Sequence, residues 1–298
     1  MKYRILLVLT AAIWGFAFVA QIVAMDDIGP FTFNAVRSYI GSLSLLPVLL
    51  LTKREPSPEK ADFPKWLGIV IAGLFLCGGT ALQQFGLQYT TASKASFITA
   101  TYILMVPLFG LLLGHVLRLN HVIGAVLAMT GVYFLSVTGD FNVGLGDGLV
   151  FLCAIFFSAH ILYLDYASRR YPPLEIAAGQ FLVCGLINTC VAIPFETIQV
   201  SAILAAWWPI LYVGIFSTGI AYTLQIIGQR HLPPTECSMI LSLEMVFGGL
   251  SGFLVLGETM TLKEMPGVVC MTIGVFWSQL PSRSLLSIRN TRLLRNGE

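Results

Sequence analysis

One carboxylate is conspicuous in the sequence because it lies inside a long apolar run. Glu244 falls within residues 235–256, and a charged group in such a segment is costly and by default marks a functional site. His160 lies in a second apolar run, 147–168. At a helical rise of about 1.5 Å per residue, the two side chains reach similar depths. A carboxylate and an imidazole there could bind a proton or the ammonium group of a substrate, with the proton slightly favoured. A structural role for both remains the alternative.

Arg37 is a third charged candidate, six residues into the apolar run 31–52. Its guanidinium could meet a substrate carboxylate, or reach outward to water and pair with Asp26 or Asp27. Aromatic and amide side chains complete the candidate set, because they offer apolar faces with polar tips to an organic solute. They are Trp14, Gln21, Tyr102 and Tyr163. Core or lipid-facing packing would explain these four equally well.

Three residues could act as gating points in the helices that carry these groups. Gly248 and Gly249 loosen the run just after Glu244, and Pro107 removes a backbone hydrogen bond from another run. Close helix packing is the competing explanation for the glycines. Residues 249–252 read GLSG, as in intramembrane serine proteases, but Ser251 lies nearer the outer face than His160. We therefore expect no catalytic residue.

The composition is that of an integral membrane protein. Of 298 residues, 56% are hydrophobic and 11% charged, whereas a soluble domain has roughly 25% charged residues. All six cysteines fall in apolar runs without a CxxC pair, so neither a metal site nor a disulfide framework is expected. No phosphate-binding loop is present, and we expect no cofactor. The expected partners are a small-molecule substrate and membrane lipid, not nucleic acid; monomer or homodimer stays open.

Ten apolar segments are each long enough for the roughly 20 residues of a membrane-spanning helix. They are 4–24, 31–52, 66–88, 95–114, 120–138, 147–168, 174–195, 207–229, 235–256 and 264–281. The connections are short and rich in glycine and proline. The fold class predicted from this pattern is an all-α bundle of ten transmembrane helices.

The chain also reads as one unit written twice. Gly114, Gly124 and Gly131 recur 143 positions later, and Tyr102 stands 142 positions before Glu244. Gln21 and Tyr163 are another pair at 142. Each copy has five helices, and an odd number inverts the second copy relative to the first. This 5+5 construction is typical of secondary transporters with a site near the bilayer midplane. We predict repeats at 1–140 and 141–282 and a basic cytoplasmic tail at 283–298.

The distribution of positive charge predicts the orientation. With the N-terminus inside, cytoplasmic loops and ends hold fourteen of the 17 lysines and arginines. The outer loops hold two, Lys94 and Lys263, and Arg37 lies within a helix. The bias of positive residues toward the cytoplasm therefore predicts a cell-membrane protein with both termini inside.

Four stretches of sequence give the chain a family resemblance. They are AAIWGFAFVAQ at 11–21, GPFTFNAVRSYIGSL at 29–43, TTASKASFITATYILMVPLFGLLLG at 90–114 and GET at 257–259. The chain resembles the EamA-domain branch of the drug/metabolite transporter superfamily over nearly its whole length. The resemblance implies a carrier for small metabolites, often amino acids, with four helices of each half lining a cavity and the fifth peripheral. One departure is residues 115–118, HVLR, where the family often has a charged Arg/Glu cluster.

These observations favour a secondary transporter of an amino acid or similar amphipathic solute that works by alternating access. Export coupled to the proton gradient and facilitated diffusion both remain open. An intramembrane enzyme and a membrane scaffold without transport are the alternatives from other functional classes.

Overall fold

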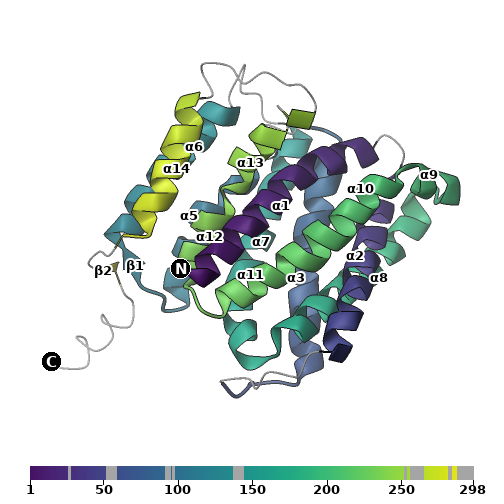
Figure 1. Ribbon diagram of the computed structural model, residues 1–298, viewed down its shortest axis with the longest axis horizontal. Helices are drawn as coiled ribbons and strands as arrows, with labels where there is room; N and C mark the ends of the chain where they lie inside the picture. Colours follow the sequence, from purple (N-terminus) through teal and green to yellow (C-terminus); the bar gives the residue numbers. More distant parts are fainter. Residues whose placement is uncertain are drawn as a thin grey trace.

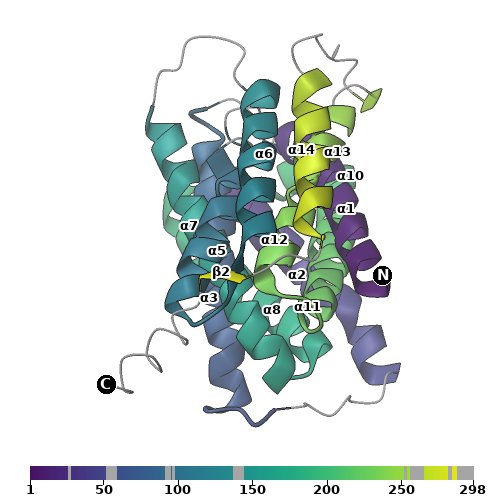
Figure 2. The same cartoon turned by 90° about the vertical axis from the view of Figure 1, so that its left-hand side faces the viewer.

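The helices run side by side as one bundle in the computed structural model (Figures 1 and 2). It describes residues 1–25, 28–51, 59–90, 95, 98–136, 144–251, 254–255, 265–280 and 284–286. The helices are α1 Lys2–Ala24, α2 Pro30–Leu51, α3 Lys65–Gly86, α5 Tyr102–Leu112, α6 Leu119–Ser136, α7 Leu145–Arg170, α8 Pro173–Phe195, α9 Val200–Ala205, α10 Trp207–Leu211, η1 Tyr212–Ala221, α11 Tyr222–Gln229, α12 Pro234–Leu241, α13 Glu244–Ser251 and α14 Met265–Ser278.

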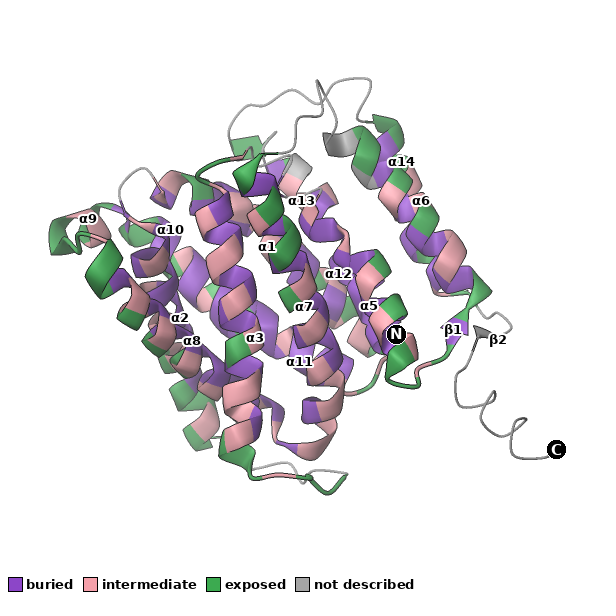
Figure 3. Cartoon of the chain, turned by 180° about the vertical axis from the view of Figure 1, so that it is seen from behind, coloured by how far each residue is buried: buried purple, intermediate pink, exposed green. Residues whose placement is uncertain are grey.

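Six helical stretches in the described chain are long and apolar enough to cross a membrane. They are α1, α2, α3, α7, α8 and the continuous run Trp207–Gln229. Shorter apolar helices cover Ile98–Leu112, Leu119–Gly131 and Met265–Ser278. Large apolar side chains such as Leu50, Phe195 and Phe276 lie exposed, and exposed residues recur along the outward faces (Figure 3). Hydrocarbon, rather than water, suits such a surface.

The helices that surround the centre pack in interlocked pairs. α2 packs against α8 and η1, while α3 packs against α7 and α8. α1 contacts α13, η1 and α11, and α5 contacts α7 and α12. Helices from the first half of the chain therefore pack against helices from the second half around the middle of the bundle.

The helices α6 and α14 form a separate pair at one edge of the bundle (Figures 1 and 2). Glycines make their close contact. A Cβ atom on Gly124 would lie 2.7 Å from the carbonyl oxygen of Gly274, and one on Gly131 would lie 2.5 Å from that of Gly267. Two of the three repeated glycine pairs, Gly124 with Gly267 and Gly131 with Gly274, thus form the surface on which these two helices touch.

The ninth predicted segment is not one continuous helix. α12 ends at Leu241, and α13 begins at Glu244. Between them Leu243 N–H donates to Ile240 C=O over three residues instead of four, which tightens the turn. The fourth segment has the equivalent feature, where Thr101 N–H donates to Ile98 C=O just before α5. The sequence analysis expected the helix to loosen after Glu244, whereas in the structure the helix is interrupted just before Glu244.

A small sheet interrupts the expected all-helical fold. β1, Leu117–Arg118, pairs antiparallel with β2, Ser284–Leu286, so the start of the basic tail lies against the connection between α5 and α6. The rest of the tail, Asp26 and Asp27, loop 52–58 and the GET motif at 257–259 lie outside the described residues.

Candidate functional site

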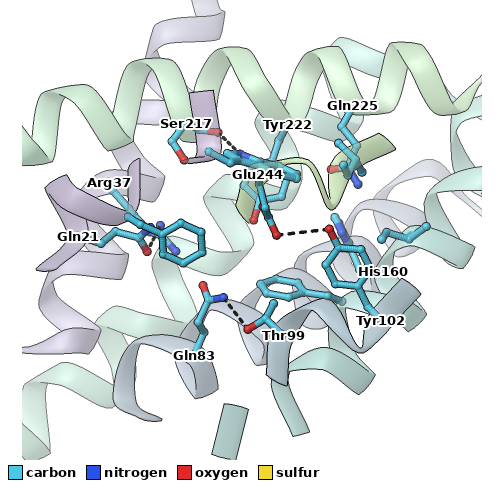
Figure 4. A pocket seen from close by; sticks show the side chains of 15 residues that line it. Gln21, Arg37, Gln83, Thr99, Tyr102, His160, Ser217, Tyr222, Gln225 and Glu244 are labelled. Atoms are coloured by element: carbon cyan, nitrogen blue, oxygen red, sulfur yellow. Dashed lines mark hydrogen bonds between the residues drawn. The ribbon is translucent and has the colours of Figure 1, made fainter. Parts of the chain in front are cut away.

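A central cavity lies between α1, α2, α3, α5, α7, the η1–α11 run and the α12–α13 break (Figure 4). The space between its walls, open solvent included, is about 590 Å³. The lining residues are Trp14, Phe18, Gln21, Arg37, Gln83, Thr99, Tyr102, Phe157, His160, Ile161, Ser217, Tyr222, Gln225, Leu241 and Glu244. Aromatic rings, amides and two opposite charges therefore face one space.

Glu244 and Tyr102 occupy matching positions on two broken segments. Each is the first residue of the helix that follows the break, α13 and α5 respectively. The Tyr102 hydroxyl donates to Glu244 Oε1 at 3.3 Å, and both residues are buried. The N–H groups of Met245 and Phe247 in the first turn of α13 donate to the carbonyl oxygens of Ser242 and Leu243. Tyr102 is therefore the side-chain donor that the structure gives to the buried carboxylate at the cavity wall.

Arg37 lies across the cavity from this carboxylate (Figure 4). The residue is 5% exposed, so it does not reach outward to water. Its Nη1 donates to Gln21 Oε1 at 3.5 Å, and its guanidinium lies 5.5 Å from the centre of the Phe33 ring. Arg37 forms no ion pair with any described residue.

The aromatic wall of the cavity is held by hydrogen bonds from the second half of the chain. Trp14 Nε1–H donates to the Ser217 carbonyl oxygen at 3.1 Å, and its ring lies 4.6 Å from that of Tyr222. His160 is 1% exposed, and its Nε2 lies 3.0 Å from Gln180 Oε1. These contacts fix the orientation of the rings without a bound solute.

Several sequence candidates lie elsewhere. Tyr163 is outside the cavity, and its hydroxyl donates to the Gly68 carbonyl oxygen at 2.9 Å. Pro107 is buried inside α5, which continues through it to Leu112. Gly248 and Gly249 both lie within α13.

The contact between α1 and α13 depends on a glycine that the sequence analysis did not select. A Cβ atom on Gly15 would lie 2.4 Å from Phe247 Cβ and 2.7 Å from the Glu244 carbonyl oxygen. Ser251, the serine of the protease-like motif, is buried and donates its hydroxyl to the Gly15 carbonyl oxygen at 3.1 Å. Ser251 therefore ties α13 to α1 and does not line the cavity.

The repeat spacing would have found several lining residues that the sequence analysis missed. Four pairs of cavity residues are separated by 142 positions, the spacing at which Tyr102 and Glu244 recur. They are Phe18 with His160, Gln83 with Gln225, Thr99 with Leu241, and Tyr102 with Glu244. Gln83 and Gln225 were missed because an uncharged amide in an apolar run does not by itself indicate a binding site. Ser217 and Tyr222 have no lining partner at this spacing.

Comparison with known proteins now decides the family. The sequence pattern of the EamA-like transporter family matches residues 1–137 and 144–279. The chain belongs to the EamA-like transporter family. This EamA-like protein is 34% identical over 270 residues to an uncharacterised transporter of Archaeoglobus fulgidus, covering 90% of this chain and 83% of the relative.

A second relative of this EamA-like transporter has a named substrate. The threonine/homoserine exporter RhtA of Escherichia coli K12 is 28% identical over 281 residues, covering 91% of this chain and 89% of RhtA. A solved crystal structure at 21% identity has the same fold, with a TM-score of 0.78 over 95% of this chain and 99% of that one. The family resemblance predicted from the motifs is confirmed. The EamA-like protein is a multi-pass membrane transporter, not an enzyme.

Proposed function

We propose that this chain is a secondary transporter that moves zwitterionic amino acids, or similar amphipathic solutes, by alternating access. One observation carries the proposal: Arg37 and Glu244 are buried at the same cavity, and neither is in an ion pair with a described residue. Leaving single charges in a buried site is costly unless a partner of opposite sign arrives. A solute with one carboxylate and one ammonium group supplies both partners.

Each charge has a defined role in this proposal. The planar guanidinium of Arg37 binds the substrate carboxylate through two parallel hydrogen bonds. Glu244 accepts hydrogen bonds from the ammonium group. The rings of Trp14 and Tyr222 cover the apolar part of the solute, as aromatic side chains do in small-molecule sites. Glu244 also takes up a proton when the site is empty, so that substrate and proton compete for one carboxylate.

The proposed architecture is two inverted five-helix repeats, 1–140 and 141–282. Three observations support it. The fourth and ninth segments break at equivalent places, four pairs of lining residues share one spacing, and the repeated glycines meet between α6 and α14. Transporters of this construction work by rocking one repeat against the other around a central site.

The proposed direction is export from the cytoplasm across the cell membrane, with both termini cytoplasmic. The name of the E. coli relative, a threonine/homoserine exporter, supports export of a small amino acid. The distribution of lysine and arginine supports the orientation. A titratable carboxylate in the cavity supports coupling to the proton gradient.

Substrate counterflow into liposomes tests the proposal with the purified chain. Unlabelled L-threonine and L-threonine amide, which lacks the carboxylate, compete against radiolabelled L-threonine. We expect Arg37→Lys to weaken competition by L-threonine roughly tenfold and to spare the amide, because a point charge replaces a bidentate fork. Arg118→Lys, at an exposed residue of β1, is the matched control.

Two results would contradict the proposal. Absence of flux for every amino acid offered to the wild-type protein would remove amino acids as substrates. Equal loss of both competitors in Arg37→Lys, together with a lower protein yield, would assign Arg37 a structural role.

A further inference from the structure

Gln225 is a buried amide in the cavity wall whose side chain has no hydrogen-bond partner. It lies on α11, is 1% exposed, and its Oε1 is buried without a donor. Burying an acceptor without a donor is costly. Its counterpart at the repeat spacing, Gln83, is hydrogen-bonded, because its Nε2 donates to Thr99 Oγ1 at 3.3 Å. Leu241 stands where Thr99 would recur, so the Nε2 of Gln225 lacks the hydroxyl acceptor that Gln83 uses, and the amide is held at neither end.

Two other residues of the cavity wall also offer acceptors. Glu244 Oε1 accepts one hydrogen bond, from Tyr102. His160 places Nε2 against the amide oxygen of Gln180, so Nε2 carries the proton, and Nδ1 keeps the lone pair of the neutral ring. Figure 4 shows Gln225 and His160 on the same side of the cavity as Tyr102, away from Arg37. This end of the cavity therefore suits a group rich in donors.

We infer that Gln225 determines specificity for a primary ammonium group, by accepting one of its three N–H bonds beside Glu244 and His160. The inference rests on the proposed function and adds a substrate class to it. A carboxylate alone attracts any ammonium, whether primary or methylated. Three acceptors from α11, α13 and α7 can each take one N–H bond, so every methyl group added to the nitrogen leaves an acceptor unpaired.

The inference predicts how substrates are ranked. Primary amino acids should bind well, N-methyl amino acids less well, and N,N,N-trimethyl derivatives poorly. Hydrogen bonds to charged groups are worth roughly 1.5–3 kcal/mol, so the first methyl group should weaken binding about tenfold or more. The methyl groups also collide with acceptors that were placed to receive hydrogen atoms.

Competition binding in detergent tests this ranking without requiring transport. Wild type, Gln225→Leu and Gln225→Met are compared with L-alanine, L-threonine and L-phenylalanine and the N-methyl form of each. In wild type we expect each N-methyl form to bind about tenfold less well. In both variants the primary forms should weaken by a similar factor, so that the ratio approaches one. The second variant guards against misfolding of the first.

Gln229→Leu is the control, because Gln229 is a buried amide of α11 outside the cavity, with an unpaired Oε1 and an Nε2 that donates to the Ile161 carbonyl oxygen. This variant should keep the wild-type ratio. An unchanged ratio in Gln225→Leu and Gln225→Met would overturn the inference while leaving the proposed function intact. So would a loss of binding confined to L-threonine and absent for L-alanine and L-phenylalanine, which would assign Gln225 to a substrate hydroxyl group. Failure of every amino acid to bind the wild type would overturn both.

Discussion

At the scale of single residues, the cavity keeps its two charges apart and only partly satisfied. Glu244 receives a phenol hydrogen bond from Tyr102 and sits at the first turn of α13. Arg37 rests between the ring of Phe33 and the amide of Gln21. None of these contacts is an ion pair. Both groups therefore keep hydrogen-bonding capacity for a solute, which a buried ion pair between them would have consumed.

Glu244→Gln separates the possible roles of the carboxylate. If Glu244 holds the substrate ammonium, as we propose, Glu244→Gln should abolish both counterflow and gradient-driven uptake. The glutamine side chain keeps the shape of glutamate but carries no negative charge to bind the ammonium. Both fluxes are measured on one preparation of liposomes. Glu59→Gln, at a partly exposed carboxylate near the end of α7, is the control.

Other outcomes for Glu244→Gln have distinct meanings. Counterflow that survives while the response to a pH gradient disappears would restrict Glu244 to proton binding. Unchanged transport with unchanged pH dependence would remove the residue from the site.

Charge and repeat spacing were the signals that located the site in the sequence. Glu244, His160 and Arg37 are costly in apolar helices, and all three line the cavity. Tyr163 was predicted from its residue type, but it lies three residues beyond His160 on α7 and does not line the cavity. Gln225 carries no charge, so only its spacing from Gln83 distinguishes it from other buried amides.

At the scale of elements, the contact between α1 and α13 determines where Glu244 stands. Gly15 lets the two backbones approach, and Ser251 adds a hydrogen bond to the Gly15 carbonyl oxygen. Because the Glu244 carbonyl oxygen is among the atoms nearest to Gly15, this packing also fixes the start of α13.

Two glycine substitutions at this contact should behave differently. Gly15→Ala should destabilise the protein by about 1–3 kcal/mol, because the new methyl group overlaps Phe247 and the Glu244 backbone. In Gly248→Ala the methyl group would be 3.7 Å from Phe18, an ordinary contact, so stability should change little. Thermal unfolding in detergent measures both. Equal melting temperatures for the two variants would show that α1 moves aside without cost.

The broken helices could not be located from hydropathy. Residues 235–256 are apolar apart from Glu236 near the start, Glu244 and a few hydroxyls, with no proline inside the run. The turn at Ser242 and Leu243 uses side chains that a continuous helix would also accept. Gly248 and Gly249 were the stronger local signal for a break in the helix, yet α13 continues through them.

At the scale of the whole molecule, ion pairs gather at one end of the bundle. Lys65 pairs with Glu175, Arg170 with Glu59, and Arg4 with Glu236. The first pair joins the N-terminal ends of α3 and α8, the second joins the C-terminal end of α7 to the segment before α3, and the third joins α1 to α12. We expect this end to face the cytoplasm, where lysine and arginine concentrate.

Labelling of inserted reporters tests the orientation. A reporter fused after Arg295 should face the cytoplasm, and one inserted between Gly144 and Asp147 should face outside. The reason is the ratio of fourteen positive residues to two between the sides. A cytoplasmic label at residues 144–147 would reject both the orientation and the inverted repeat.

Because η1 is π-helical, the shape of the cavity depends on the number of residues in this stretch as well as on the side chains that line the cavity. Hydrogen bonds in η1 close over five residues, so each ring holds one residue more than in an α-helix. Loss of one residue there would return the stretch to α geometry and turn Gln225 by roughly 100° relative to α10. An ancestor or descendant lacking that residue would keep every lining side chain in its sequence and still present a different wall to its solute.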